Sequence, residues 1–257
     1  MRYELLGSLR VVDGDGPSSI SAQKIEILLA SLLAHADHVL SVDQLMGEIW
    51  GERQPRRALA GLHVYVSEVR KFLYRPDRAA GPVLTRSPGY LLRLDGDALD
   101  AREFLELVAL GRRYLRERRF EEAGEAFERG LALWRGPALG DVGRGPVLRG
   151  FATRLTEARL ECTELLVDAQ LRRGRHREVV GLLYTLTVEN PLREAFHRQL
   201  MLALYRSERR ADALRAYRSA RRTLLDELGL EPCTPMQELH RAILRSDDPD
   251  GAMAPVG

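Results

Sequence analysis

Residues 56–73 read RRALAGLHVYVSEVRKFL, and residues 85–90 read TRSPGY. In the first stretch apolar residues recur every three or four positions, which predicts a helix with one buried face. This apolar stripe consists of Leu59, Leu62, Val66, Val69 and Leu73. In the second stretch a Ser-Pro-Gly turn separates two short strand-like runs, Val83–Arg86 and Tyr90–Arg93, and predicts a hairpin. A helix that can enter the major groove of DNA, followed by a basic hairpin, is the arrangement of a winged helix.

The predicted helix carries small and basic residues on the face opposite the stripe. These residues are Arg57, Ala60, Val64, Ser67 and Lys71, with Tyr65 and Arg70 on the flanks. One acid, Glu68, stands among them. We therefore expect DNA contacts from this helix, from its start and from the hairpin. The candidate contact residues are Arg56, Arg57, Gly61, His63, Val64, Tyr65, Ser67, Glu68, Arg70, Lys71 and Arg86.

Seven of the candidates divide by chemistry into two groups. The cations are expected to contact phosphates and to supply most of the affinity, with Arg86 as the candidate for the minor groove; they are Arg57, Arg70, Lys71 and Arg86. Three others, Val64, Ser67 and Glu68, are expected to select the DNA sequence. Val64 can contact a thymine methyl group, Ser67 can hydrogen-bond to a base edge, and Glu68 can accept from a cytosine amino group.

Several candidates also have a purely structural interpretation. Gly61 can allow close helix packing, and Tyr65 can lie partly in the core. His63 can be a polar surface residue. Arg70 and Lys71 can complement the dipole at the end of the helix. The sequence leaves these alternatives open.

Charge is distributed unevenly along the first part of the chain. Residues 1–52 carry three basic and eight acidic side chains, a net charge of −5, whereas residues 53–93 carry nine and two, a net charge of +7. The positive charge therefore coincides with the predicted helix and hairpin, as phosphate contact requires. A solvated basic face is the alternative.

Strand and helix signals precede the predicted helix. Residues 3–12 are rich in Leu and Val and predict a strand, followed by a turn. A helix follows from Ser21. A second helix opens at Ser41, where Gln44 three positions later predicts a capping box, and it ends near Gly51. These elements predict an N-terminal winged helix-turn-helix domain of α+β type over residues 1–94.

The rest of the chain is helical in period. Basic turns open similar helices at residues 119, 174 and 208, close to the 34-residue period of tetratricopeptide repeats. We expect an all-α, tetratricopeptide-like helical repeat domain over residues 95–246 and a disordered tail over 247–257. The predicted fold class is thus mainly α, with two domains.

Motifs for catalysis, metal binding and membrane insertion are missing from the sequence. The six histidines and two cysteines form no metal-ligand array, and no phosphate-binding glycine loop occurs. There is no long apolar run. We expect a non-catalytic protein without cofactor, metal or membrane contact, located in the cytoplasm with the nucleoid.

The order and spacing of several motifs resemble one family along nearly the whole chain, from Leu5 to about Leu244. The first half contains LLGSLRV, VDQLMGEIWG, HVYVSEVRKFL and PGYLL, and the second contains DAREF, LALWRGPAL, NPLREAFHRQLMLALYRSERRADALRAYRSAR and LLDELGLEP. The chain resembles the Streptomyces antibiotic regulatory protein family, in which an OmpR-like winged helix precedes a bacterial transcriptional activation domain.

The resemblance implies a transcriptional activator of an antibiotic biosynthetic gene cluster. Such a protein binds direct repeats in double-stranded DNA as more than one protomer and recruits RNA polymerase holoenzyme. No receiver domain precedes the winged helix in this sequence, so phosphorylation control of the two-component kind is not expected. Two departures from the family pattern concern recognition of the DNA target. Glu68 stands where relatives usually carry a basic residue, and the wing turn has one arginine, Arg86.

Two other functions remain as alternatives. In the first, the helical repeats bind a protein partner and the winged helix is a scaffold. The charge distribution argues against this adaptor function, whereas Glu68 favours it. In the second, the repeats bind a small pathway intermediate, for which the sequence offers no specific signal.

Overall fold

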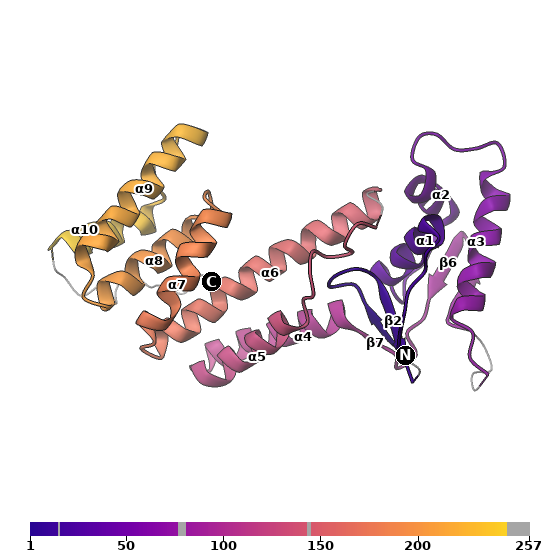
Figure 1. Cartoon of the computed structure of the whole chain (residues 1–257), viewed down its shortest axis with the longest axis horizontal. Coiled ribbons are helices and arrows are strands. Elements are labelled where there is room, and N and C mark those ends of the chain that lie inside the picture. Colours follow the sequence, from indigo (N-terminus) through magenta and orange to yellow (C-terminus); the bar gives the residue numbers. More distant parts are fainter. Residues whose placement is uncertain (15, 77–80, 143–144, 246–257) are drawn as a thin grey trace. The chain divides into compact units, whose positions relative to one another are not determined.

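The computed structural model describes residues 1–14, 16–76, 81–142 and 145–245 (Figure 1). Within these ranges the chain forms ten helices and seven short strands, which confirms the mainly α fold class. The chain divides into two compact units. Unit 1 comprises Met1–Ala109 and Glu128–Glu161, and unit 2 comprises Leu110–Phe127 and Cys162–Gly257. The tail predicted at 247–257 lies outside the described residues.

All seven strands of the described residues lie before residue 100, and long helices make up the rest. The strands are β1 (Arg2–Glu4), β2 (Arg10–Asp13), β3 (Gly16–Ser18), β4 (Leu40–Ser41), β5 (Val83–Arg86), β6 (Gly89–Leu92) and β7 (Ala98–Leu99). The helices are α1 (Gln23–Ala34), α2 (Val42–Trp50), α3 (Ala58–Phe72), α4 (Asp100–Arg116), α5 (Phe120–Ala132), α6 (Pro146–Arg172), α7 (His176–Glu189), α8 (Glu194–Arg206), α9 (Arg210–Leu228) and α10 (Thr234–Arg245).

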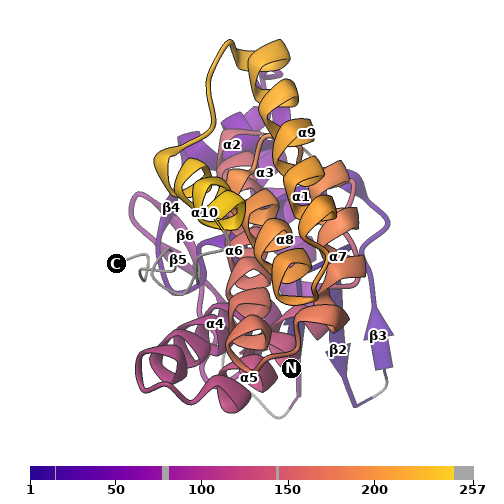
Figure 2. The ribbon, with the colours of Figure 1, turned by 90° about the vertical axis from the view of Figure 1, so that its left-hand side faces the viewer.

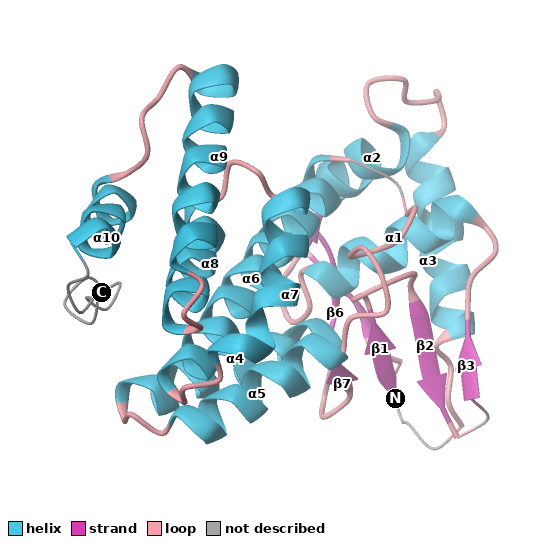
Figure 3. Cartoon of the chain, turned by 60° about the vertical axis from the view of Figure 1, so that its left-hand side comes forward, coloured by secondary structure: helices cyan, strands magenta, loops and turns pink. Residues whose placement is uncertain are grey.

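Unit 1 contains the winged helix. Helices α1, α2 and α3 pack on one another (Figure 3), and the three-stranded sheet β4-β6-β5 supplies the wing. The wing strands are antiparallel, with Thr85 opposite Tyr90 and Arg86 opposite Gly89. Helix α3 and the hairpin therefore form where the apolar period and the Ser-Pro-Gly turn predicted them.

The apolar stripe of α3 differs from the predicted one at its first position. Leu62, Val66, Val69 and Leu73 are buried, but Leu59 is 49 % exposed. Helix α3 begins at Ala58, and it is Ala58 that continues the four-residue spacing toward Leu62 and is buried. Since neighbouring helical residues point about 100° apart, Leu59 turns away from the core.

Two local features set the start of α2 and the position of the wing. Ser41 accepts a hydrogen bond from the Gln44 N–H at 3.1 Å, and Gln44 Oε1 accepts one from the Ser41 N–H at 3.0 Å, which confirms the capping box. At the wing, Gly89 pairs with Ser41 across β4 and β6. A Cβ atom at Gly89 would lie 1.9 Å from the Leu40 carbonyl oxygen, so only glycine allows this close approach.

The strand predicted over residues 3–12 is instead two strands separated by a turn. Strand β1 ends at Glu4 and β2 begins at Arg10. The backbone N–H groups of Leu5 and Leu6 donate to the carboxylate of Asp100 and not to another strand. The strand is interrupted because a side chain far along the sequence takes these donors. The four-stranded sheet then has the order β3-β2-β1-β7, with β1 and β7 parallel.

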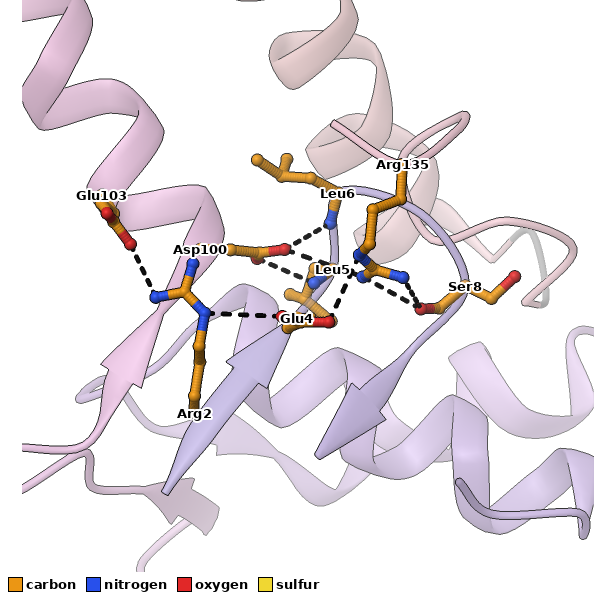
Figure 4. Close-up of polar contacts among 8 residues, drawn as sticks. All are labelled: Arg2, Glu4, Leu5, Leu6, Ser8, Asp100, Glu103 and Arg135. Carbon is orange, nitrogen blue, oxygen red and sulfur yellow. Dashed lines mark hydrogen bonds and ion pairs between the residues drawn. The ribbon is translucent and has the colours of Figure 1, made fainter. Parts of the chain in front are cut away.

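Asp100 is the centre of a polar network in unit 1 (Figure 4). Its carboxylate is 1 % exposed and accepts from the Leu5 N–H at 2.8 Å and the Leu6 N–H at 2.9 Å. Arg135 donates to the Ser8 carbonyl oxygen at 3.3 Å and forms an ion pair with Glu4 at 3.3 Å. The turn at residues 5–8 is thus held both by the first residue of α4 and by Arg135.

A second buried carboxylate joins α2 to α6. Glu48 is 5 % exposed, and its two oxygens accept from the backbone N–H groups of Val147 at 2.9 Å and Leu148 at 3.0 Å. These N–H groups belong to the first turn of α6, which has no intrahelical acceptor for them. Glu48 therefore caps a helix about 100 residues further along the chain.

Compact unit 1 accordingly takes in more than residues 1–94. It includes β7, the first part of α4 and the start of α6, all of which contact the winged helix through the bonds described above. The domain boundary at residues 94/95 stays a prediction from the sequence.

Unit 2 is a helical array in which α7, α8 and α9 lie side by side and α10 packs on α8 and α9 (Figure 2). Helices α7 and α9 begin at His176 and Arg210, 34 residues apart, which agrees with the predicted repeat. The buried residues of α8, among them Phe196, Leu200 and Leu204, supply the middle of the core.

The repeated turns share one backbone device. Arg118, Gly174 and Glu208 have positive φ, and the N–H of the next residue donates to the carbonyl five positions before it in each case. That next residue is Arg119, Arg175 or Arg209, and each forms an ion pair with an acid three positions on. This equivalence of three turns supports a true internal repeat.

Asp100→Ala is expected to lower the free energy of unfolding by about 3 kcal/mol, because each buried N–H group left without an acceptor costs about 1–3 kcal/mol. Urea unfolding followed by circular dichroism measures the change. Glu106→Ala, an exposed acid on the same helix, is the control and should change stability by less than about 0.5 kcal/mol. Equal stability of the two variants would contradict the assigned role of Asp100.

Candidate nucleic-acid interface

The outer face of α3 presents a continuous row of exposed side chains. Residues Arg57, Ala60, Val64, Ser67 and Lys71 are all exposed, as are Arg56 and His63 near the start of the helix. Val64 is 58 % exposed, so no neighbouring loop buries it. An exposed valine on a row of small and basic side chains suits contact with a thymine methyl group.

The N-terminus of α3 leaves backbone donors available. Arg57 occupies the N-cap without a side-chain cap hydrogen bond, and no acid lies in the first turn. The N–H groups at a helix start that no side chain caps, with Arg56 and Arg57 beside them, form an environment that attracts a phosphate.

Glu68 lies beside Lys71 on the exposed surface. Lys71 Nζ is 3.3 Å from Glu68 Oε1, and the two side chains are 76 % and 45 % exposed. A pair this exposed contributes little to stability. The lysine ammonium lies close enough to offset part of the negative charge of the carboxylate on this face of the helix.

Gly61 and Tyr65 pack against Trp50 at the end of α2. The rings of Tyr65 and Trp50 are stacked with centroids 5.7 Å apart, and the Lys24 ammonium lies 5.5 Å from the Trp50 centroid. A Cβ atom at Gly61 would come within 3.2 Å of the Trp50 ring. Both candidates therefore support the helix pair α2–α3, the structural alternative that the sequence left open.

Arg70 bonds to the wing. Its Nε donates to the Val83 carbonyl oxygen at 3.1 Å, and its Nη2 donates to Thr85 Oγ1 at 2.9 Å. The sequence predicted a phosphate contact for Arg70. The helical period indicates on which side of the helix this residue lies, but it does not indicate that the strands of the wing pack beside that side. Arg86, at the end of β5, is exposed at the tip of the wing.

The described residues contain no cluster of His, Cys, Asp and Glu suited to a metal ion. Among the same residues, no helix is both long enough and apolar enough to cross a membrane.

Comparison with known proteins identifies both parts of the chain. Residues 19–92 match the family described as "Transcriptional regulatory protein, C terminal", and residues 99–244 match the "Bacterial transcriptional activator domain". The chain is 37 % identical over 250 residues to transcriptional regulator RedD of Streptomyces coelicolor, covering 96 % of this chain and 71 % of RedD. The chain belongs to the Streptomyces antibiotic regulatory protein family.

Two further relatives also match nearly the whole chain. Regulatory protein DnrI of Streptomyces peucetius is 37 % identical over 254 residues, covering 96 % of this chain and 93 % of DnrI. A solved structure, "Mycobacterium tuberculosis EmbR in complex with low affinity phosphopeptide", superposes with a TM-score of 0.92 at 32 % identity. The superposition covers 98 % of this chain and 66 % of the EmbR chain.

These relatives are regulators, and the matched domains are regulatory and not catalytic. The chain is thus a transcriptional regulator and not an enzyme, as the sequence predicted. Its winged-helix domain implies DNA binding.

Gly61→Val is expected to lower the free energy of unfolding by about 1–2 kcal/mol, since the added methyl groups force the Trp50 ring away from α3. Chemical denaturation monitored by circular dichroism measures this loss. Ala60→Val places the same side chain on the neighbouring exposed position and serves as the control. If both variants unfold at the same denaturant concentration, Gly61 is not needed for the packing on Trp50.

Proposed function

We propose that this family member is a sequence-specific DNA-binding activator of a secondary-metabolite, antibiotic-type biosynthetic gene cluster. The observation that carries the proposal is the exposed row on α3, from Arg57 to Lys71, with the exposed Arg86 of the wing on the same compact unit. Helix α3 enters the major groove, and the wing reaches the adjacent minor groove. The names of the relatives RedD and DnrI, both regulators from Streptomyces, support the same assignment.

Affinity and sequence preference come from different side chains in this proposal. Arg57, Lys71 and Arg86 contact phosphates or the minor groove and supply the salt-dependent part of the affinity. Val64 and Ser67 read base edges. Glu68, held next to Lys71, accepts from a cytosine amino group.

The regulator binds direct repeats, and its partner is RNA polymerase holoenzyme. Two protomers on direct repeats face the same way, so the contact between them is heterologous and not two-fold. The bacterial transcriptional activator domain, residues 99–244, is the part that recruits polymerase in the cytoplasm.

An adaptor function, with the helical repeats as the binding surface, is the second candidate. Exposed apolar side chains on and after α7 favour it: Leu182 is 43 %, Val188 80 % and Leu192 43 % exposed. DNA binding by the winged helix distinguishes the two candidates.

Fluorescence anisotropy with promoter-region fragments flanking the gene of the protein tests the proposal at two salt concentrations. The expected result is saturable binding to one fragment that survives moderate salt and an excess of random DNA. Equal binding to all fragments at both salt concentrations would contradict sequence-specific recognition and favour the adaptor.

Lys71→Ala is expected to weaken binding to every DNA sequence by a similar factor. Loss of one phosphate contact should also reduce the slope of log K against log salt by about one unit. Anisotropy titrations at four or more salt concentrations measure both quantities. Unchanged affinity together with an unchanged slope would show that α3 does not lie in the groove as proposed.

Val64→Ala is the matched control for Lys71→Ala, because it removes an exposed side chain of the same helix without changing charge. It should leave the salt slope unchanged and alter the preference among base-pair variants of the site. A uniform loss over all sequences would instead assign Val64 to stability.

A further inference from the structure

Arg70 lies in the last turn of α3, and its guanidinium group reaches both strands of the wing. On β5 its Nε donates to the Val83 carbonyl oxygen at 3.1 Å and its Nη2 donates to Thr85 Oγ1 at 2.9 Å. On β6 the ring of Tyr90 lies below the guanidinium carbon, 5.9 Å from its centroid. Thr85 and Tyr90 are register partners across the hairpin, so Arg70 engages one cross-strand pair.

Strand β5 is the edge strand of the sheet β4-β6-β5. Strand β6 is held on its other side by β4, where Leu40 pairs with Tyr90 and Ser41 with Gly89. Strand β5 is therefore held by its ladder of hydrogen bonds to β6 and by the hydrogen bonds from Arg70 of α3. Arg86 directly follows Thr85 on this outer strand, so the bonds of Arg70 end one residue before the tip of the wing.

The chemistry of these contacts suits arginine and not lysine. A guanidinium group directs several N–H donors in one plane and can bond a carbonyl and a hydroxyl at once while it stacks on an aromatic ring. An ammonium group is a point charge on a flexible stem, which retains attraction to phosphate but not this geometry. The neighbouring Lys71 contacts Glu68 on α3 itself and does not reach the wing in the contacts described above.

We propose that Arg70 is a positioning residue that fixes the wing relative to α3. The contacts of α3 with base edges and the contact of Arg86 with the minor groove then occur at a fixed spacing along the DNA. Two donors of Arg70 are engaged by β5, through the Val83 carbonyl oxygen and Thr85 Oγ1, and are not offered to phosphate. The part of this inference that concerns DNA binding rests on the proposed function. Its structural part, the bracing of β5 by α3, is independent of that function.

The structural part is tested without DNA by hydrogen exchange of the backbone amides of Val83–Arg86. Arg70→Lys should accelerate exchange there by about tenfold or more, because β5 loses its bonds to α3 while charge is preserved. Lys71→Ala is the control and should leave these rates within about twofold of the unchanged protein. Equal exchange in all three proteins would overturn the bracing role.

The functional part is tested by a double-mutant cycle of Arg70→Lys and Arg86→Ala on the fragment that the unchanged protein prefers. Arg86→Ala alone should weaken binding by about tenfold. In a protein that already carries Arg70→Lys it should weaken binding by less than about threefold, because the wing no longer holds Arg86 at the minor groove. The cycle of Lys71→Ala with Arg86→Ala should be additive.

A phosphate contact by Arg70 predicts a different pattern. Arg70→Lys would then keep most of the affinity, Arg70→Ala would reduce the salt slope by about one unit, and both would be additive with Arg86→Ala. This pattern would overturn the proposal. Absence of any preferred fragment for the unchanged protein would contradict the proposed function and leave the exchange experiment to decide the bracing role.

Discussion

The buried carboxylate of Asp100 accepts hydrogen bonds from the N–H groups of Leu5 and Leu6, and the link between the N-terminal sheet and α4 depends on these two bonds. They end β1, turn the chain toward β2 and join the first residue of α4 to the N-terminal sheet. Burial raises the pKa of the Asp100 carboxyl, whereas the two N–H donors and the nearby Arg135 guanidinium oppose that rise. A carboxylate buried in this way is favourable only while its donors stay in place.

Glu48, near the end of α2, likewise uses a buried carboxylate to accept hydrogen bonds from two backbone N–H groups, in this case those at the start of α6. Through Asp100 and Glu48, residues of the activator domain take part in the compact unit that carries α3 and the wing. Helix α3 and the wing, the elements proposed to read DNA, therefore belong to a unit held together by contacts that span about 100 residues of sequence. A change at the start of α4 or α6 reaches the winged helix through hydrogen bonds and not through a flexible linker.

Local signals in the sequence are sufficient to predict individual helices and strands, but they are insufficient to predict the contacts between them. The capping box at Ser41 and the stripe Leu62, Val66, Val69 and Leu73 depend on residues three or four apart, and the structure contains both. The exposed face of α3 follows from the same period. Leu59 was misplaced because the period alone does not determine at which residue a helix begins.

The remaining differences arise from residues distant in sequence. Gly61 meets Trp50, Arg70 meets Val83, and Asp100 meets Leu5, and no periodicity encodes these pairs. As a result, Gly61 and Tyr65, two candidates for which the sequence left DNA contact and packing open, lie against the half-buried Trp50. The roles of the exposed candidates on DNA stay predictions, and the charge and small size of their side chains are the physical basis for them.

Methylation interference on the preferred promoter fragment tests most directly whether α3 and the wing read adjacent grooves. Methylation at guanine N7 blocks the major groove, and methylation at adenine N3 blocks the minor groove. The account predicts interference at N7 within each repeat and at N3 about half a helical turn, or roughly five base pairs, away. Interference confined to one groove, or undiminished binding with both grooves methylated, would contradict it.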